Sequence, residues 1–362
     1  MATQIMDDFV DVWYYPTSAL HSISAETNNF KVDITVLHQM ATDEYPDLPP
    51  REIFATTLYP NNGTVELSDA GSLIERYFKQ QGLVVGWIIF RFDESEIRVH
   101  SLYCERVVSD SYDPFSEFFL STPVQRVYSD SFITLAVADR ELPFSFAAVG
   151  YDENGDLEIA RWAESPRMPQ CTAEYSVAEI LSQAFNAQTD GERRLSDIRY
   201  FSVRYGDIQK MFYIASAPSH LTFAFRNHYN VKEFVDIVGV MNTKTEQEVS
   251  HATCSHRIAS YDRSVTMTYE IQTEALPAAE FPLFEQFLTS STVELLSDDG
   301  RWVPVIISDF SCESSSDDET FSSIKFEWTF ADDRPRVYRS VLNGIMPSRR
   351  NIFNPSFSAE YE

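Results

Sequence analysis

The chain has 362 residues, of which 44% are hydrophobic and 14% aromatic, so it holds enough apolar material for two or three packed domains. Its formal net charge of −27 argues against binding to nucleic acid phosphates or to an anionic membrane, which both require clustered Lys and Arg. Four scattered cysteines favour neither a disulfide framework nor zinc, and we expect no signal peptide and no transmembrane segment.

Residues 1–29 are predicted to form an N-terminal arm. The stretch "DVWYYP" contains Trp13, Tyr14 and Tyr15 before any clear domain begins, which makes these three aromatics candidates for an interface anchor. Together with Trp87, Tyr103 and Trp162, such aromatics also suit a sugar-stacking platform, although core packing is the favoured explanation for most of them.

Two segments of the first two thirds share one pattern without gaps. Phe54–Leu67 reads "FATTLYPNNGTVEL" and Phe146–Ile159 reads "FAAVGYDENGDLEI". Asn-Gly between two apolar strands is a strong hairpin signal, because both residues tolerate positive φ. The shared Phe-Ala, Tyr and Glu therefore predict a duplicated hairpin, in modules over residues 30–110 and 111–217.

Each predicted hairpin is followed by an amphipathic helix and two more strands. The first helix lies within Ser68–Gly82, with Ser68 as its N-cap and Gly82 as its stop, and the second begins at Ser176, which forms a capping box with Glu179. Two-strand stretches follow, with turns at Asp93–Ser95 and at Gly206-Asp207. The unit is therefore strand, turn, strand, short helix, strand, turn, strand.

A third module is predicted over residues 218–332. We expect strands at Leu221–Arg226 and Ser264–Thr273, a helix over Phe281–Thr289, and a hairpin that turns at Asp298-Asp299-Gly300. Pro304 indicates an edge strand or a bulge, and the polar stretch "EQEVSHATCSHRIASYD" is predicted to be a solvated loop. The fold class is mainly β: tandem small β-sandwich-like modules, each with a short helix.

The tail over residues 333–362 is predicted to be a C-terminal arm that is either extended or wrapped on a neighbouring molecule. It carries a basic patch, and four of its residues are candidate interface positions: Arg336, Arg339, Arg349 and Arg350.

Motifs for catalysis or cofactor binding are missing from the sequence. There is no G-x-S-x-G, no P-loop and no G-x-G-x-x-G. His251, Cys254 and His256 do not have an established zinc spacing, and "YDENGDLE" lacks the length and terminal Glu of a calcium loop. Abundant carboxylates alone do not define a glycosidase pair, because sequence does not give their separation. We therefore expect no enzyme activity, no metal and no cofactor.

The run from Thr268 to Glu313 resembles the strand–helix–hairpin core of phage tail-tube and distal-tail proteins, in which the hairpin has the form "ELLSDDGRWVPVII". "PSHLTFAFRNHYNVKEF" and "ASYDRSVTMTYEIQTEAL" are also similar to proteins found in phages and prophages of gut Bacteroidales. This resemblance implies a virion structural protein, made in the host bacterial cytoplasm, that forms a homo-oligomeric ring and contacts other tail proteins. The chain has two modules more than a simple tube protein. The resemblance therefore favours a component of a tail tip, a baseplate or an adaptor. A carbohydrate-binding β-sandwich protein is the alternative.

Overall fold

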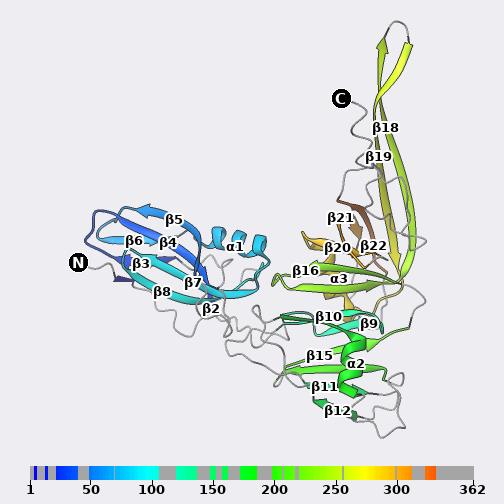
Figure 1. Cartoon of the computed structure of the whole chain (residues 1–362), viewed down its shortest axis with the longest axis horizontal. Coiled ribbons are helices and arrows are strands. Elements are labelled where there is room, and N and C mark those ends of the chain that lie inside the picture. The colour runs from blue at the N-terminus through cyan, green and yellow to red at the C-terminus, as the bar shows by residue number, and fades with distance from the viewer. Residues whose placement is uncertain are drawn as a thin grey trace, which may run out of the picture. The chain divides into compact units, whose positions relative to one another are not determined.

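The computed structural model describes residues 4–5, 13–14, 22–39, 49–68, 70–105, 120–136, 147–151, 157–161, 172–185, 198–205, 208–216, 220–254, 257–297, 300–311 and 323–331. The fold is mainly β, with several sheets and a few short helices, as the sequence predicts (Figure 1). Within these ranges no helix is long and apolar enough to cross a membrane.

The chain divides into two compact units that alternate along the sequence. Unit 1 contains Met1–Pro218, Phe225–Asp236 and Ala279–Ser290, and unit 2 contains Ser219–Ala224, Ile237–Ala278 and Ser291–Glu362. The module boundaries expected at residues 29, 110, 217 and 332 stay a prediction.

Among the described residues, the first part of unit 1 contains two sheets and one helix. A three-stranded sheet has the order β1-β3-β6, and a five-stranded sheet has the order β2-β8-β7-β4-β5. Their bounds are β1 Gln4–Ile5, β2 Trp13–Tyr14, β3 Ile23–Glu26, β4 Val32–Gln39, β5 Arg51–Leu58, β6 Thr64–Leu67, β7 Val85–Phe92 and β8 Ser95–Leu102. Helix α1, Ala70–Gln81, adds the buried Ile74 and Phe78 to a core shared with both sheets. Gly82 has φ +65° and ends the helix, as predicted.

The hairpin predicted over Phe54–Leu67 is wrong, although its turn is correct. Asn62 and Gly63 have φ values of 55° and 84°, as Asn-Gly favours. However, β5 pairs with β4, and β6 pairs with β3 in the other sheet. The chain changes sheets at this turn because the alternate apolar residues of β6, Val65 and Leu67, are buried in the common core.

The second copy of the pattern does form a hairpin. Strand β11, Ala147–Tyr151, pairs antiparallel with β12, Leu157–Arg161, in the predicted arrangement. The two segments therefore share a sequence pattern but differ in strand pairing.

The second part of unit 1 has a five-stranded sheet of order β12-β11-β14-β15-β9 and a two-stranded sheet of β10 and β13. The remaining bounds are β9 Val124–Val127, β10 Phe132–Ala136, β13 Thr172–Ser176, α2 Val177–Phe185, β14 Tyr200–Tyr205 and β15 Ile208–Ile214. The predicted N-cap of α2 is confirmed, because the backbone N–H of Glu179 donates to Ser176 Oγ at 3.1 Å. Val177 and Ile180 are buried, which confirms the start of the apolar stripe.

A seven-stranded sheet has the order β17-β16-β20-β21-β22-β19-β18. Its bounds are β16 Leu221–Arg226, β17 Lys232–Ile237, β18 Gly239–Cys254, β19 Arg257–Thr273, β20 Val293–Leu296, β21 Trp302–Ser311 and β22 Lys325–Phe330. Trp328 is fully buried at its centre, where its ring stacks on Tyr269 with centroids 4.4 Å apart. A short 3₁₀ segment, Ala278–Glu280, leads into α3, Phe281–Thr289, whose Phe281, Phe284, Phe287 and Leu288 are buried as predicted.

Two predictions for the last third are wrong. Most of the polar stretch expected to be a loop lies in β18 and β19, which pair with each other from Gly239↔Thr273 to Cys254↔Arg257. Pro304 does not lie in an edge strand, because β21 has β20 on one side and β22 on the other. The ladder with β22 ends at Val305↔Phe330, next to Pro304, so the missing N–H of Pro304 breaks no pair of that ladder. The carbonyl of Pro304 accepts the N–H of Ala331 at 3.0 Å. The predicted turn at Gly300 is confirmed by φ +75°.

His38 is a buried titratable side chain in the first part of unit 1. It is 3% exposed on β4, its Nδ1 lies 3.5 Å from Tyr77 Oη, and a methyl group at Gly86 would come within 2.5 Å of its Nε2. Burial first, and the positive charge of Arg51 second, lower the pKa of His38 to about 4. The imidazole is therefore neutral in the folded protein at pH 7.

We expect His38 to reduce stability on acidification. The unfolded imidazole binds a proton below its ordinary pKa of 6.5, and the folded one only near 4, so stability is lost as the pH falls from 6.5 towards 4 and is retained above 6.5. The loss between pH 7 and pH 4.5 is roughly 2–3 kcal/mol. Thermal melts of the wild type and of His38→Leu at both pH values measure it: the variant should lose less on acidification. Equal losses would show that His38 does not titrate in this way.

Candidate functional site

The interface residues predicted from sequence are only partly placed. Trp13 and Tyr14 form β2, which pairs in parallel with β8 through Trp13↔His100 and Tyr14↔Ser101. Their backbone therefore belongs to a sheet rather than to a separate arm. Tyr15 and the four arginines, Arg336, Arg339, Arg349 and Arg350, lie outside the described residues.

The other candidates from sequence are also separated. Trp87 is half-buried, with His100 stacked on its ring at 4.7 Å and Arg98 lying 5.3 Å from its centroid. Trp162, His256 and the residues 152–156 lie outside the described ranges. His251 and Cys254 belong to β18. The part of the chain that the structure describes thus does not gather these residues into one site.

The structure instead shows a polar cluster inside unit 1, which we call the Lys210 cluster: Ser121, Lys210, Asn227 and Glu233. Lys210 lies on β15 between residues of an apolar strand, Glu233 lies on β17, and Asn227 begins the turn between β16 and β17. The side chains of Lys210 and Glu233 are 0% and 2% exposed, and Asn227 is 2% exposed. Buried polar groups of this kind are stable only when they are bonded to one another.

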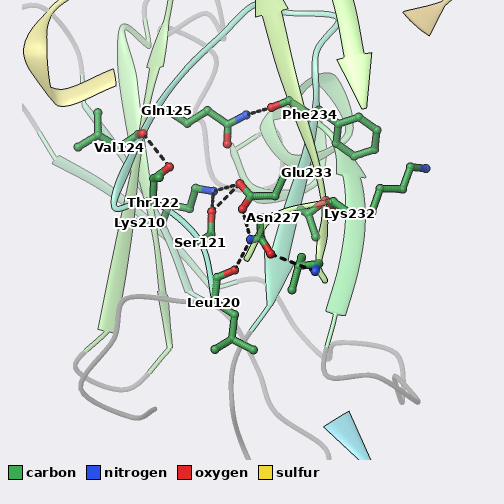
Figure 2. Close-up of polar contacts among 12 residues, drawn as sticks. Leu120, Ser121, Thr122, Val124, Gln125, Lys210, Asn227, Lys232, Glu233 and Phe234 are labelled. Carbon is green, nitrogen blue, oxygen red and sulfur yellow. Dashed lines mark hydrogen bonds and ion pairs between the residues drawn. The ribbon is translucent and has the colours of Figure 1, made fainter. Parts of the chain in front are cut away.

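Glu233 is the centre of the Lys210 cluster (Figure 2). Its Oε2 lies 3.5 Å from Lys210 Nζ and accepts a hydrogen bond from Ser121 Oγ at 2.6 Å. Its Oε1 accepts a hydrogen bond from Asn227 Nδ2. Lys210 Nζ also donates to Ser121 Oγ. One carboxylate therefore holds an amine on one oxygen and an amide on the other.

The Asn227 side chain is held at every polar position. Its Nδ2 also donates to the carbonyl of Leu120 at 2.7 Å, and its Oδ1 accepts the backbone N–H groups of Tyr229 at 2.9 Å and Val231 at 3.0 Å. Because a backbone N–H only donates, these contacts fix which side-chain atom is the oxygen. The asparagine shapes the turn and presents a carbonyl that two donors polarise.

The electrostatics of Lys210 are set by its burial. Desolvation lowers the pKa of its ammonium from 10.5, and the charge and hydrogen bond of Glu233 oppose this shift. The carboxylate of Glu233 compensates part of the desolvation of the buried ammonium, and Ser121 Oγ accepts a further hydrogen bond from Nζ. The cluster is therefore suited to hold a lysine whose neutral form is more accessible than at the surface.

Neighbouring contacts fix β17 beside the second part of unit 1. Gln125 Nε2 donates to the carbonyl of Phe234 at 2.9 Å, Thr134 Oγ1 donates to the carbonyl of Lys232, and Ser131 Oγ donates to Asp236. These bonds come from β9, β10 and the turn between them. The position of Glu233 is thus determined by several independent contacts along its strand.

The other end of the β16–β17 turn contacts the first part of unit 1. Asn230, with φ 62°, donates from Nδ2 to the carbonyls of Phe78 at 3.0 Å and Leu83 at 2.9 Å, at the end of α1. Glu105 contacts both His228 and Lys79, and these contacts lower its pKa to about 2, with the His228 hydrogen bond as the largest cause. The turn therefore binds two parts of unit 1 at once.

Sequence reasoning missed the Lys210 cluster. The available signal is a charged residue within an apolar strand, as in "DIQKMFYI" around Lys210 and "VKEFVDIV" around Glu233. A charged residue that is flanked by buried strand positions needs a partner in the core. Which residue is that partner depends on the strand order, which the sequence does not give.

A second candidate site is the ribbon, which we define as the part of β18 and β19 from Thr245↔Met267 outward. Among the described residues, β22 pairs with β19 only over Tyr269–Gln272, so the ribbon strands pair with each other alone. Figure 1 shows them continuing well past the neighbouring strands of their sheet. The ten residues from Thr245 to Cys254 span roughly 30 Å at ~3.3 Å per residue.

The two faces of the β18–β19 pair differ in character. Opposed residues share a face, and the face of the buried Tyr269 and Ile271 continues outward through the half-buried Met267, Val265 and Val249, which are paired with Thr245, Gln247 and Arg263. The other face carries Asn242, Lys244, Glu246, Thr266 and Glu270. A face that contains apolar side chains, which we call the apolar face, thus continues from the sheet core onto strands that have no further sheet neighbour among the described residues.

A scan of the chain against protein-family models finds no match, and a search of curated proteins also finds none.

Proposed function

We propose that this protein is a non-enzymatic structural component of a phage tail tip, baseplate or adaptor that assembles with copies of itself into a ring. The observation that carries the proposal is the ribbon. A two-stranded β-structure is at best marginally stable by itself, and it gains stability when another surface covers its apolar face.

The ribbon suits a second copy of this chain as its partner. With a net charge of −27, two copies repel each other over most of their surfaces. On this face of the ribbon, Val249, Val265 and Met267 carry no charge and Arg263, opposite Val249, is basic, so contact there adds no acidic pair to this repulsion. Repeated contact between a projecting element and a different patch of the next copy closes into a ring when the rotation permits.

The resemblance of Thr268–Glu313 to tail proteins supplies the class of particle. The order that this resemblance requires, a strand, a helix and a hairpin, is present as β19, α3 and the β20–β21 pair. The alternative, carbohydrate binding through exposed aromatics, has less support because His100 already covers one face of Trp87.

Substitutions on the two faces of the ribbon test self-association. Met267 faces the apolar side and Thr266 faces the polar side, opposite Glu246. We expect the wild type to form oligomers at micromolar concentration in mass photometry, Met267→Lys to shift them at least tenfold towards monomer, and the matched Thr266→Lys to have little effect. A monomeric wild type, or equal behaviour of both variants, would refute assembly through this face.

The particle assignment has its own test. Antibodies or mass spectrometry should detect the chain in purified particles of the phage or prophage that encodes it. Oligomerisation in solution together with absence from particles would leave the ribbon interface in place and reject the tail assignment.

A further inference from the structure

The Lys210 cluster brings an amine, a carboxylate and a carboxamide to one buried point (Figure 2). Lys210 Nζ lies 3.5 Å from one oxygen of Glu233, and Asn227 Nδ2 donates to the other. All three side chains are at most 2% exposed. These are the groups needed to join a lysine and an asparagine through an amide, in a place where bulk water is excluded.

We propose that Lys210 and Asn227 form an intramolecular isopeptide bond, with Glu233 transferring the protons. The bond would link β15 to the β16–β17 turn inside unit 1. It is a chemical property of the chain that is independent of self-association.

The reaction balances without a cofactor or an oxidant. Glu233 removes a proton from the Lys210 ammonium, and the lone pair on Nζ attacks Cγ of Asn227, so that the Nζ–Cγ bond forms and the carbonyl electrons move to Oδ1. Glu233 then gives its proton to Nδ2 and takes the second proton from Nζ. When the carbonyl re-forms, the Cγ–Nδ2 bond breaks and ammonia leaves with the bonding pair. The products are a secondary amide and one ammonia, which accepts the remaining proton of Glu233.

The electrophile is prepared for this attack. Negative charge develops on Oδ1, and this oxygen already accepts two backbone N–H groups, from Tyr229 at 2.9 Å and from Val231 at 3.0 Å. Two fixed donors at a developing oxyanion are among the strongest contributions that a protein makes to amide chemistry. They are in place because the same contacts shape the β16–β17 turn.

The nucleophile is also prepared. Burial lowers the pKa of Lys210, which increases the share of neutral amine that carries a free lone pair. Ser121 Oγ contacts both Lys210 Nζ and Glu233 Oε2, so the amine and its base are held together. Attack requires Nζ to approach Cγ to ~3–3.5 Å, and the shared carboxylate keeps both groups within one cluster.

A buried ion pair beside a turn-forming asparagine accounts for some of these contacts without a covalent bond. The mass of the protein separates these two explanations. The intact full-length chain, purified from the cytoplasm of an expression host and measured by electrospray mass spectrometry, should be lighter than its sequence mass by one ammonia.

Trypsin digestion locates the bond. Trypsin cleaves after Arg204, Arg226 and Lys232, but cleaves after Lys210 only when its amine is free. The linked protein should give a branched product in which Tyr205–Arg226 is joined to Asn227–Lys232. The unlinked chain gives Tyr205–Lys210, Met211–Arg226 and Asn227–Lys232 as separate peptides.

Variants separate this bond from other losses of ammonia. Lys210→Met, Asn227→Ala and Glu233→Gln should each have the full sequence mass, whereas the matched control Lys232→Arg should keep both the loss and the branched peptide. Succinimide formation at an Asn-Gly pair such as Asn62-Gly63 also releases ammonia, but it would persist in Lys210→Met.

The wild-type chain alone decides the proposal, whether or not the variants fold. A folded wild type, with a cooperative thermal melt, that has the full sequence mass and releases the free Met211–Arg226 peptide would overturn it. This result would leave the ring assembly untouched, since that is measured by oligomeric state.

Discussion

Gly239→Ala should separate β18 from β19 at the first pair that joins them. A Cβ at this position would lie 2.3 Å from the carbonyl oxygen of Gln272, 2.9 Å from its carbon and 3.0 Å from Thr273 Cα. These are backbone atoms, so no side chain can rotate away. Thr273 is itself held, because its N–H donates to the carbonyl of Ile324 at 2.9 Å. We expect a cost of about 3 kcal/mol or more.

Hydrogen exchange measures this effect where it arises. Amides of the pairs that follow Gly239, on β18 and on the facing half of β19, should exchange faster in Gly239→Ala, and unit 2 should melt at a lower temperature. The adjacent Val240 is 70% exposed, so Val240→Ala is a matched control that should change stability by less than ~0.5 kcal/mol. Unchanged exchange in Gly239→Ala would mean that the two strands are farther apart at this point than the structure places them.

Asn230→Ala should strongly destabilise the β16–β17 turn. It removes both donors from the buried carbonyls of Phe78 and Leu83, and it places alanine at φ 62°. The Phe78 carbonyl keeps the N–H of Leu83 at 2.9 Å, whereas the Leu83 carbonyl loses its donor, which costs about 1–3 kcal/mol, and left-handed backbone adds about 1–2 kcal/mol for alanine. The sum is roughly 2–5 kcal/mol, measured as a drop in the melting temperature of unit 1.

Two further substitutions divide this loss into its causes. Asn230→Gly tolerates the backbone conformation, so it should be about 1 kcal/mol less damaging than Asn230→Ala. Asn230→Asp keeps the size of the side chain but sets a carboxylate against two carbonyl oxygens, and it should be at least as damaging as alanine. If Asn230→Gly and Asn230→Ala were equally destabilising, the loss of the Asn230 hydrogen bonds alone would account for the lost stability.

Turns and helix caps could be predicted from the sequence, because neighbouring residues determine them. Asn62, Gly63 and Gly300 adopt the positive φ that their turns require, and Ser176 caps α2. Strand partners were not readable, since they depend on residues far away in the chain. The Asn62-Gly63 turn was therefore predicted correctly, while the pairing of β5 with β4 rather than with β6 was not.

The Lys210 cluster and the part of the ribbon outside the predicted strand Ser264–Thr273 were missed for opposite reasons. Exposed charged residues of the ribbon, such as Glu246 and Glu248, are typical of a loop in sequence. Only the spacing of Val265 and Met267 indicates a strand there. Lys210 lies in an apolar context that correctly predicts a strand, but nothing nearby in the sequence shows that Glu233 compensates its charge. Both cases depend on the identity of a cross-strand or cross-sheet neighbour.

The alternation of the two units along the chain affects the order in which the parts of the protein can fold. Synthesis proceeds from the N-terminus, and domains generally fold as they leave the ribosome. Here the first 218 residues emerge before Phe225–Asp236 and Ala279–Ser290, which belong to the same unit. Until those segments are synthesised, the carbonyls of Phe78 and Leu83 lack the hydrogen bonds from Asn230, and Lys210 lacks its ion pair with Glu233. The nascent chain therefore passes through a period in which unit 1 is incomplete and exposes apolar and polar groups to which chaperones can bind. Unit 1 can finish folding only after most of the chain has been translated.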